Sequence, residues 1–501
     1  MDFAVEPLRV SLERVEFQYG VGETNGEAAA SGATGSKTGS KRVILAETSL
    51  EIPAGLCVVI TGPSGGGKTT LVRLLNGLIP HFYSGILTGE IRLAVDTASG
   101  ESRDETLHPS TAPLWKTGGR VATVFQNPRT QFFTTDTTSE MAFGLENAGA
   151  SPDLIAQRVN AVAESLGVSG LLGQSLFALS GGQKQLVATA GAAVGSPGLY
   201  LFDEPTSNLS AASISRFSEV LRELKARGAT IVIAEHRLYF LRELADRVIL
   251  VDGEIREDWE GSEFFSLPEE RIRGLGLRTL LEPQIETPKM SQKARPHDSL
   301  TLADVEVAYG KRVLLKIDKL VFPRGRVIGV TGSNGIGKSS LAAVLTGLKK
   351  AARGTITLDG ERLGRKARTR ASYLVMQDVN RQLFTDSALA ELRLGNEVSA
   401  ERAREILDEY DLGEYAEAHP LALSGGQKQR LTVAAAVALD REIYVFDEPS
   451  SGLDFGHMQA ITDALRRLAE AGKVVILITH DAELMNAAAD SYLDLSDFSA
   501  S

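Results

Sequence analysis

Two glycine-rich octapeptides have the composition of a phosphate-binding loop. They read GPSGGGKT at 62–69 and GSNGIGKS at 332–339, and both fit the pattern G-x-x-x-x-G-K-[ST]. Glycines allow successive backbone N–H groups to converge on one anion, and the helix expected after each loop adds partial positive charge. Lys68 and Lys338 are therefore expected to reach the β- and γ-phosphates, and Thr69 and Ser339 to hold Mg²⁺.

An acidic pair follows an apolar run in each half of the chain, in LYLFDEP and IYVFDEP. Ligands of open α/β sheets bind at the carboxyl ends of strands, so Asp203 and Asp447 are expected to reach Mg²⁺. Glu204 and Glu448 lie one residue further, on the other side of the pleat, where a carboxylate can orient and deprotonate water. Solvated strand-end carboxylates are the alternative, and the order of the motifs along the chain disfavours it.

The chain is an internal duplication. LSGGQKQ, FDEP and a histidine after an apolar run each occur twice, 244 positions apart, with the histidines at His236 and His480. Lys68 and Lys338 are 270 positions apart, so the first copy has 26 additional residues before LSGGQ. A Ser/Thr/Gly/Pro-rich stretch at about 94–119 predicts a flexible surface insertion, and a Gly/Ala/Ser-rich stretch at 22–41 predicts a second.

Short, uninterrupted apolar runs such as CVVI, LYLF and IVIA indicate strands buried on both faces of a parallel sheet. Helical patterns such as RFSEVLRELKARG lie between them, and the terminal glycine of that pattern suits a left-handed cap. Alternating strands and helices predict two α/β domains, at 1–256 and 300–501. The charged, Pro- and Gly-containing stretch 257–299 is expected to be a linker with some short helix.

Composition excludes several classes of protein. The 501 residues are 43% apolar and 23% charged, as in ordinary globular proteins. Cys57 is the only cysteine, which excludes internal disulfides and cysteine-ligated zinc and favours a reducing compartment. There is no spanning apolar run and no secretory signal, so a membrane role would require a partner. The net charge of −11 disfavours broad binding to nucleic acid, and no nucleic-acid partner is expected.

The two LSGGQ motifs resemble the signature of ATP-binding cassette (ABC) ATPases, and the resemblance covers both halves of the chain. It implies two tandem P-loop NTPase domains, each a mainly parallel sheet with flanking helices, an antiparallel β subdomain and a helical signature subdomain. It also implies that each signature faces the phosphate loop of the other copy, so that one chain closes head to tail on two ATP molecules. As helix N-termini, the signatures suit a γ-phosphate. A serine cap with a glycine turn is the plainer interpretation, and both can be true because a cap opens the anion site.

The resemblance assigns further roles. Tyr19 and Tyr309 would stack on adenine, with a core or edge-strand tyrosine as the alternative. Gln126 and Gln377 match the Q-loop, a Mg²⁺ contact, and His236 and His480 match the switch histidine. The expected catalytic residues are Glu204, Glu448, His236, His480, Gln126 and Gln377, and the expected metal contacts are Thr69, Gln126, Asp203, Ser339, Gln377 and Asp447. The expected nucleotide contacts are Tyr19, Gly62, Pro63, Ser64, Gly65, Gly66, Gly67, Lys68, Thr69, Thr70, Tyr309, Gly332, Ser333, Asn334, Gly335, Ile336, Gly337, Lys338, Ser339, Ser340, Ser180, Gly181, Gly182, Gln183, Ser424, Gly425, Gly426 and Gln427.

One position departs from the family pattern. The loop after Glu448 contains the expected Asp454, whereas the loop after Glu204 has Ser210 at that place. This loop crosses the seam between the cassettes, so communication between the sites is expected to be asymmetric. Both lysines, glutamates and histidines are present, and two hydrolytically competent sites are therefore predicted.

The segments 124–147 and 376–392 resemble the Q-loop region of energy-coupling factor (ECF) transporter ATPases, including QNP, Gln131 and the MAFGLEN ending. This resemblance implies a fused ATPase pair on the cytoplasmic face of a membrane. It would bind a membrane scaffold subunit and energise uptake of a vitamin or transition-metal ion captured by a small substrate-binding membrane subunit.

Two alternatives remain. Tandem sugar-importer ATPases have a similar length, but usually have one degraded site. Soluble ABC-F translation factors carry a long basic linker, whereas residues 257–298 are more acidic than basic. They also have an asparagine-histidine step after the catalytic glutamate, which the loops after Glu204 and Glu448 lack. DNA-repair cassettes are excluded, because they would need zinc-binding cysteines and the chain has one cysteine.

Overall fold

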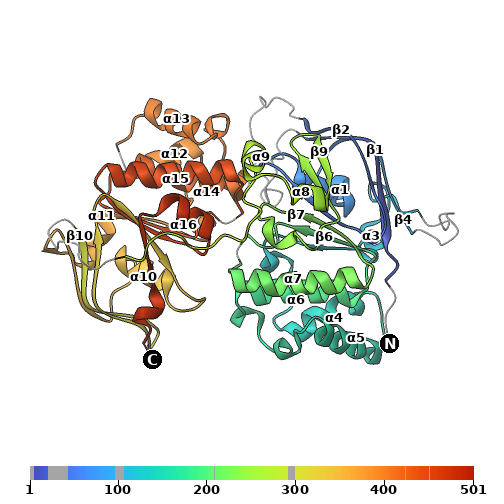
Figure 1. Ribbon diagram of the computed structural model, residues 1–501, viewed down its shortest axis with the longest axis horizontal. Helices are drawn as coiled ribbons and strands as arrows, with labels where there is room; N and C mark the ends of the chain where they lie inside the picture. Colours follow the sequence, from blue (N-terminus) through green and yellow to red (C-terminus); the bar gives the residue numbers. More distant parts are fainter. Residues whose placement is uncertain are drawn as a thin grey trace. The chain divides into compact units, whose positions relative to one another are not determined.

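The computed structural model describes residues 5–20, 43–95, 106–207, 209–290, 299–395, 397–423, 425–450 and 452–500. The chain divides into two compact units, and the boundary between them lies between Glu282 and Pro283 (Figure 1). Each unit contains one sheet of mainly parallel strands and one antiparallel sheet. The predicted duplication of an α/β domain is thereby confirmed.

The first unit is built on a six-stranded sheet with the order β5-β6-β7-β3-β8-β9. All neighbouring strands are parallel except β9, which is antiparallel to β8. Strands β3, β6 and β7 are buried along their whole length, as their uninterrupted apolar sequences require. The strands are β3 (Cys57–Thr61), β5 (Val121–Val124), β6 (Leu199–Asp203), β7 (Thr230–Ala234), β8 (Arg247–Val251) and β9 (Ile255–Glu260).

Two hydrophobic cores cover the two faces of this sheet. Side chains of helices α4 to α7 contribute to one core, and α1 contributes to the other together with the antiparallel sheet β2-β1-β4. The antiparallel strands are β1 (Leu8–Tyr19), β2 (Val43–Ile52) and β4 (Gly85–Val95). The helices are α1 (Lys68–Leu75), α2 (Leu78–His81), α3 (Leu114–Gly118), α4 (Thr137–Asn147), α5 (Pro152–Ser165), α6 (Gly181–Val194), α7 (Ala211–Ala226), α8 (Gly261–Phe264) and α9 (Glu269–Gly274).

The second unit repeats this architecture with a five-stranded parallel sheet, β15-β16-β17-β12-β18, and an antiparallel sheet, β11-β10-β13-β14. Its strands are β10 (Ser299–Tyr309), β11 (Arg312–Pro323), β12 (Arg326–Thr331), β13 (Arg353–Leu358), β14 (Glu361–Arg362), β15 (Ser372–Val375), β16 (Ile443–Asp447), β17 (Val474–Ile478) and β18 (Ser491–Asp494). Its helices are α10 (Lys338–Leu345), α11 (Arg365–Ala371), α12 (Ala388–Arg393), α13 (Ala400–Glu409), α14 (Gly425–Ala438), α15 (Phe455–Glu470) and α16 (Ala482–Ala488).

The segment expected to be a linker, 257–299, is folded over most of its described length. Its first residues complete β9, and Trp259, Phe264 and Ile272 belong to the core of the first unit. Beyond the boundary, Lys289 forms a parallel bridge with Tyr492 of β18 in the second unit. The charged residues of this segment suggest a solvated tether, but its few large apolar side chains are sufficient to anchor it.

Parts of the insertion expected at about 94–119 belong to regular structure. Residues 94 and 95 end strand β4, and Leu107 forms an antiparallel bridge with Leu93 of that strand. Thr117 in α3 is fully buried. Residues 96–105 of this insertion, and the whole insertion expected at 22–41, lie outside the described residues.

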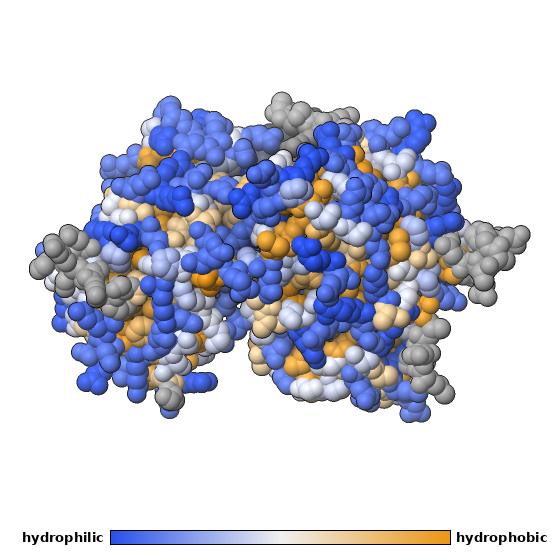
Figure 2. Space-filling view, in the orientation of Figure 1, coloured by the Kyte–Doolittle hydropathy of each residue, from blue (hydrophilic) through white to orange (hydrophobic). Residues whose placement is uncertain are grey.

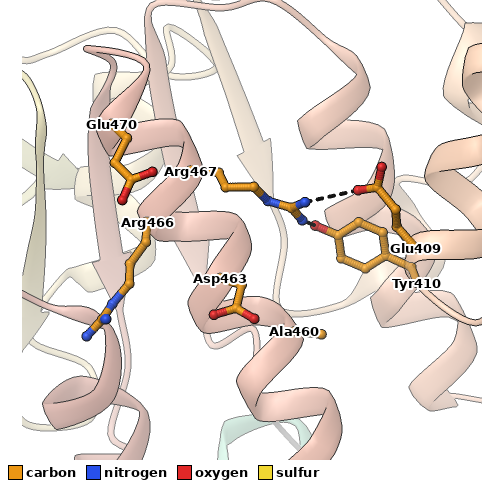
Figure 3. Close-up of a pocket in the computed structure, with 7 residues that line it drawn as sticks. All are labelled: Glu409, Tyr410, Ala460, Asp463, Arg466, Arg467 and Glu470. Carbon is orange, nitrogen blue, oxygen red and sulfur yellow. Dashed lines mark hydrogen bonds and ion pairs between the residues drawn. The ribbon is translucent and has the colours of Figure 1, made fainter.

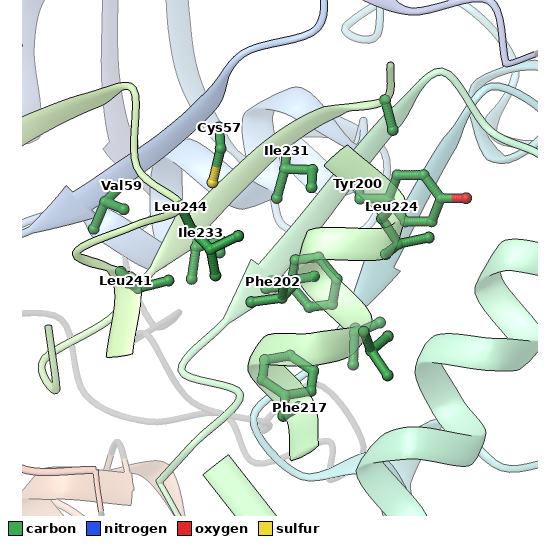
Figure 4. Packing of buried hydrophobic residues seen from close by; sticks show 14 of the residues in the cluster. Cys57, Val59, Tyr200, Phe202, Phe217, Leu224, Ile231, Ile233, Leu241 and Leu244 are labelled. Carbon is green, nitrogen blue, oxygen red and sulfur yellow. The ribbon is translucent and has the colours of Figure 1, made fainter. Parts of the chain in front are cut away.

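Cys57 is expected to be unreactive in the native protein. It begins β3 and is fully buried among Ile231, Ile233 and Leu244 (Figure 4), and this burial raises the pKa of its thiol to about 12. Since only the thiolate is nucleophilic, iodoacetamide at pH 8 should leave the folded chain unmodified and add one adduct after denaturation. Intact mass spectrometry measures this, and rapid native labelling would contradict the packing around β3.

The surface of the described residues is mainly hydrophilic on the face seen in Figure 2. Figure 2 shows hydrophilic residues over most of the visible face of both units, with apolar residues in scattered patches. No helix in the described part of the chain is both long and apolar enough to cross a membrane.

Candidate nucleotide sites

Both phosphate loops lie between a buried strand and a helix, β3 and α1 in the first unit and β12 and α10 in the second. Gly62 and Gly67 have φ values of +135° and +103°, and the corresponding Gly332 and Gly337 have +147° and +120°. L-residues with side chains rarely adopt these conformations. A Cβ atom at position 62 would also collide with the carbonyl of Val251, so the loop requires glycine for both reasons.

The two loop lysines curl back over their own loops. The Lys68 ammonium donates to the carbonyls of Gly62 and Pro63 at 2.9 and 2.8 Å. The Lys338 ammonium donates to the carbonyls of Gly332 and Ser333 at 2.8 and 3.2 Å, and burial lowers its pKa. Each ammonium is thus held against the backbone carbonyls of its own loop, where it can reach the oxygens of a bound phosphate.

Oxygen donors suitable for Mg²⁺ meet at the end of the same strands. The Thr69 hydroxyl donates to Asp203 Oδ1 at 2.9 Å. Burial, reinforced by the charge of Glu204, raises the pKa of Asp203 to about 6. Burial also raises the pKa of Asp447, while a hydrogen bond from Ser339 opposes this shift. A hydroxyl and a carboxylate are hard ligands, so both sites fit a magnesium ion bound with phosphates.

The substitution Asp203→Asn is expected to stabilise the ligand-free protein at pH 7.5. Because the folded-state pKa is raised, the folded state binds more protons than the unfolded state between about pH 4 and 6, and stability falls as pH rises through that window. Asparagine keeps the acceptor for Thr69 without a buried charge, so the melting temperature in EDTA should rise by a few degrees.

The gain from Asp203→Asn should be smaller at pH 5.0, where part of the native carboxyl is already protonated. Glu243→Gln serves as a control, because that side chain is 79% exposed. Differential scanning fluorimetry measures both variants, and an equal or lower melting temperature for Asp203→Asn at pH 7.5 would contradict the prediction.

The two glutamates predicted to be catalytic leave their strands in an unusual conformation. Glu204 and Glu448 have φ values of +46° and +53°, in the left-handed region that non-glycine residues rarely occupy. Strands β6 and β16 end one residue earlier, so the direction of each carboxylate is set by this turn and not by the pleat assumed from the sequence. The same strain in both units is typical of functional positions.

In the first unit the structure brings the predicted catalytic residues together. The Gln126 amide donates to Glu204 Oε2 at 2.8 Å, and His236 Nε2 lies 3.4 Å from Glu204 Oε1. The histidine is 3% exposed, so it is held firmly beside the carboxylate. This cluster can orient a water molecule and accept its proton.

In the second unit the corresponding carboxylate has other partners. His480 Nε2 lies 3.8 Å from Glu448 Oε1 and 3.1 Å from Asn334 Oδ1 of the phosphate loop. Glu448 Oε2 accepts hydrogen bonds from the Thr479 hydroxyl and the His480 backbone N–H, both at 3.2 Å. Thr479 was not anticipated as a site residue, since a threonine inside an apolar run is usually only a strand residue.

A second glutamine supports each Q-loop. Gln131 Oε1 accepts the backbone N–H of Phe125, and Gln382 Oε1 accepts that of Met376, both at 3.0 Å. These contacts fix the residue directly before Gln126 and Gln377. The sequence signal for Gln382 is its separation of 251 residues from Gln131, which equals the separation between the two Q-loop glutamines.

The first signature motif is an ordered helix start. Ser180 caps α6 through a reciprocal pair of hydrogen bonds with Gln183, at 3.3 and 2.9 Å. Gly182 packs against Ser213 so closely that a Cβ would lie 2.6 Å from its hydroxyl. In the second motif α14 begins at Gly425, and Ser424 lies outside the described residues.

The two tyrosines expected to stack on adenine differ. Tyr309 is 72% exposed, with the Lys349 ammonium 5.1 Å from the centre of its ring. Tyr19 is only 9% exposed, and its hydroxyl lies 3.3 Å from Thr70 Oγ1 and accepts from Arg73 at 3.2 Å. Tyr309 is thus exposed, whereas Tyr19 is a core residue, and stacking on adenine stays a prediction for both.

One surface hollow in the second unit has no part in these sites. It lies between α15 and the end of α13, and Figure 3 shows its charged lining. Arg467 donates to Glu409 at 3.0 Å and to the Tyr410 hydroxyl at 3.1 Å. Three of its lining residues thus pair with one another, and no lining residue belongs to the phosphate loop, the acidic strand end or the signature.

Comparison with known proteins identifies the family. A family model described as "ABC transporter" matches residues 45–207 and 315–451. A "Putative ABC transporter ATP-binding protein" of Treponema denticola is 43% identical over 469 residues, covering 92% of this chain and 94% of that protein. The chain belongs to the ABC transporter ATP-binding family. Its two units are therefore ABC ATPase domains, a class of domain whose activity is ATP hydrolysis.

Other relatives of this ABC protein match over nearly the whole chain. A "Putative HMP/thiamine import ATP-binding protein YkoD" of Bacillus subtilis is 30% identical over 489 residues, covering 91% of this chain and 87% of that protein. A solved structure titled "RNase-L Inhibitor" aligns with a TM-score of 0.56, covering 90% of this chain and 85% of that one. At 22% identity the latter likeness shows only the shared tandem fold.

Proposed function

We propose that this chain is the ATP-hydrolysing subunit of an ECF-type importer and acts on the cytoplasmic face of a membrane. Its partners would be a membrane scaffold subunit and a small membrane subunit that captures a vitamin or transition-metal ion. The relative named as a thiamine import protein supports an importer, and the presence of both sets of catalytic side chains supports hydrolysis at two sites. The two cassettes of one chain would close head to tail on two ATP molecules.

The residues of each site would have distinct roles in hydrolysis. Lys68 and Lys338 would bind the β- and γ-phosphates at the loop mouth. Mg²⁺, held by Thr69 and Asp203 or their counterparts Ser339 and Asp447, would neutralise phosphate charge when bound. Glutamates 204 and 448 would accept a proton from the attacking water, while the neighbouring histidines restrain its position.

A matched pair of exposed aromatic residues carries the proposal of a membrane scaffold. Phe133 and Phe384, 251 positions apart, are 74% and 75% exposed and follow the Q-loops. Their backbone N–H groups donate to Glu140 Oε2 and Glu391 Oε2, at 3.0 and 3.1 Å. Exposure of two large apolar side chains to water is unfavourable, and these two are held outward by the hydrogen bonds of their loops. An apolar helix of a scaffold subunit would cover them.

Purification from detergent-solubilised membranes of the native host tests this function. A tagged chain should retain a hydrophobic scaffold subunit, and the double variant Phe133→Ala/Phe384→Ala should lose it while keeping the ATPase rate of the isolated chain. Trp115→Ala is the matched control, because Trp115 is 75% exposed on α3. Recovery of ribosomal proteins, or of the chain alone from intact membranes, would contradict the importer proposal.

A further inference from the structure

Each unit ties the loop after its catalytic glutamate to the loop that carries its switch histidine. In the first unit the tie joins Thr206 and Leu209 to residues 235–237, and in the second it joins Ser450 to Asp481. The corresponding positions are 244 residues apart, but their side chains differ in chemistry. The two ties therefore place different groups around equivalent reaction centres.

Glu235 is the centre of the tie in the first unit. It is 2% exposed, and its carboxylate accepts four hydrogen bonds. Oε2 accepts the backbone N–H and the hydroxyl of Thr206, at 3.2 and 2.7 Å. Oε1 accepts the backbone N–H groups of His236 and Arg237, at 2.7 and 3.1 Å. One buried side chain thus fixes both loops around the switch histidine.

Arg237 extends the tie along the loop after Glu204. Its guanidinium donates to the carbonyl of Thr206 at 3.4 Å and to that of Leu209 at 3.2 Å. Leu209 directly precedes Ser210, the cap of α7. Glu235 and Arg237 thus hold the loop between Thr206 and the start of α7 against the segment that carries the switch histidine.

In the second unit the same positions carry other groups. Thr479 replaces Glu235 and donates to the catalytic Glu448, which also accepts the backbone N–H of His480. Asp481 replaces Arg237, and its Oδ2 accepts the hydroxyl of Ser450 at 3.0 Å. The tie to the post-glutamate loop is present, but the catalytic carboxylate itself binds the switch-histidine backbone.

We infer that Glu235 is a positioning residue for hydrolysis at the site of the first unit. Glu235 accepts the backbone N–H of His236, whereas in the second unit Glu448 itself accepts the backbone N–H of His480. The carboxylate of Glu204 instead contacts the amide of Gln126 and the imidazole of His236. This inference rests on the ATPase activity of the chain and needs no membrane partner, so failure of the importer proposal would leave it intact.

Glu235→Thr tests the inference in a Glu448→Gln background, where the residual ATPase rate reports the first site. Threonine cannot accept the four hydrogen bonds, so kcat should fall about tenfold or more while KM for ATP stays within about twofold. The matched control is Glu243→Thr, since that exposed carboxylate lies in the same unit. An unchanged kcat would overturn the inference.

The second unit supplies a rescue. Glu235→Thr/Arg237→Asp gives the first unit the Thr-His-Asp sequence of the second, and Thr206 supplies a hydroxyl where Ser450 does. This double variant should recover kcat to within about threefold of the background, whatever its melting temperature. A merely structural role predicts recovery of melting temperature without recovery of kcat, and that result would overturn the inference.

Glu235→Gln covers the case in which the threonine variant does not fold. Glutamine has the same size and keeps one acceptor oxygen, so the loops stay in place, but its amide nitrogen cannot accept the second pair of hydrogen bonds. It should lower kcat with KM unchanged in the same background. A change confined to KM or to melting temperature would count against Glu235 as a positioning residue.

Discussion

Glu204→Gln and Glu448→Gln are each expected to remove at least half of the steady-state ATPase activity, and the double variant should lose at least about 100-fold. Both carboxylates lie at the end of a buried strand, in the same left-handed conformation, beside a histidine. Glutamine keeps the size and one acceptor oxygen of each side chain but cannot accept a proton from water. This shared placement of the two carboxylates, at a strand end beside a histidine, is the reason for expecting a loss of activity from each variant.

The measurement is phosphate release from the purified chain with saturating Mg²⁺ and ATP. Binding of a fluorescent ATP analogue should persist in each variant, because the loop lysines and the strand-end aspartates are unchanged. Glu243→Gln again provides an exposed-carboxylate control. If only one of the two single variants reduced the rate, only one site would hydrolyse ATP, and the predicted equality would be wrong.

The parts of the site carried by contiguous motifs could be predicted from the sequence. The strand-loop-helix order around GPSGGGKT determines where Lys68 and Thr69 lie, and the parallel order β6-β7-β3 brings Asp203 to the same edge of the sheet. The resulting contact between Thr69 and Asp203 spans 134 positions. It was predictable because both residues sit at fixed places relative to buried strands.

Other features depend on contacts that no local pattern specifies. Tyr19 and Tyr309 occupy the same place in the repeat, yet neighbours contributed by α1 bury only Tyr19. Glu235 resembles an ordinary charge at the end of a strand until the fold places Thr206 within hydrogen-bonding distance. The short helices at 261–274 agree with the expected linker with some short helix, but the packing of this segment into the first unit was not predictable, because abundant charges obscured its three apolar anchors.

A charge at the first signature motif should disable the site of the opposite unit. Ser180 caps α6, and aspartate is an equally good N-cap, so Ser180→Asp preserves the helix start. In the proposed head-to-tail arrangement this serine meets the γ-phosphate of ATP held by Lys338. The added carboxylate would repel that phosphate, and hydrolysis at the second site should fall at least about tenfold, whereas Ser180→Thr should be nearly silent.

Combination with the glutamate variants identifies which site Ser180 serves. Ser180→Asp/Glu448→Gln alters one composite site twice, so its ATPase rate should equal that of Glu448→Gln alone. Ser180→Asp/Glu204→Gln alters both sites and should be as inactive as the double glutamine variant. The opposite pattern, with Ser180→Asp silent beside Glu204→Gln and severe beside Glu448→Gln, would mean that the signature serves the phosphate loop of its own unit. Because aspartate retains the cap in every variant, a difference between these pairs reflects charge at the nucleotide and not loss of the helix.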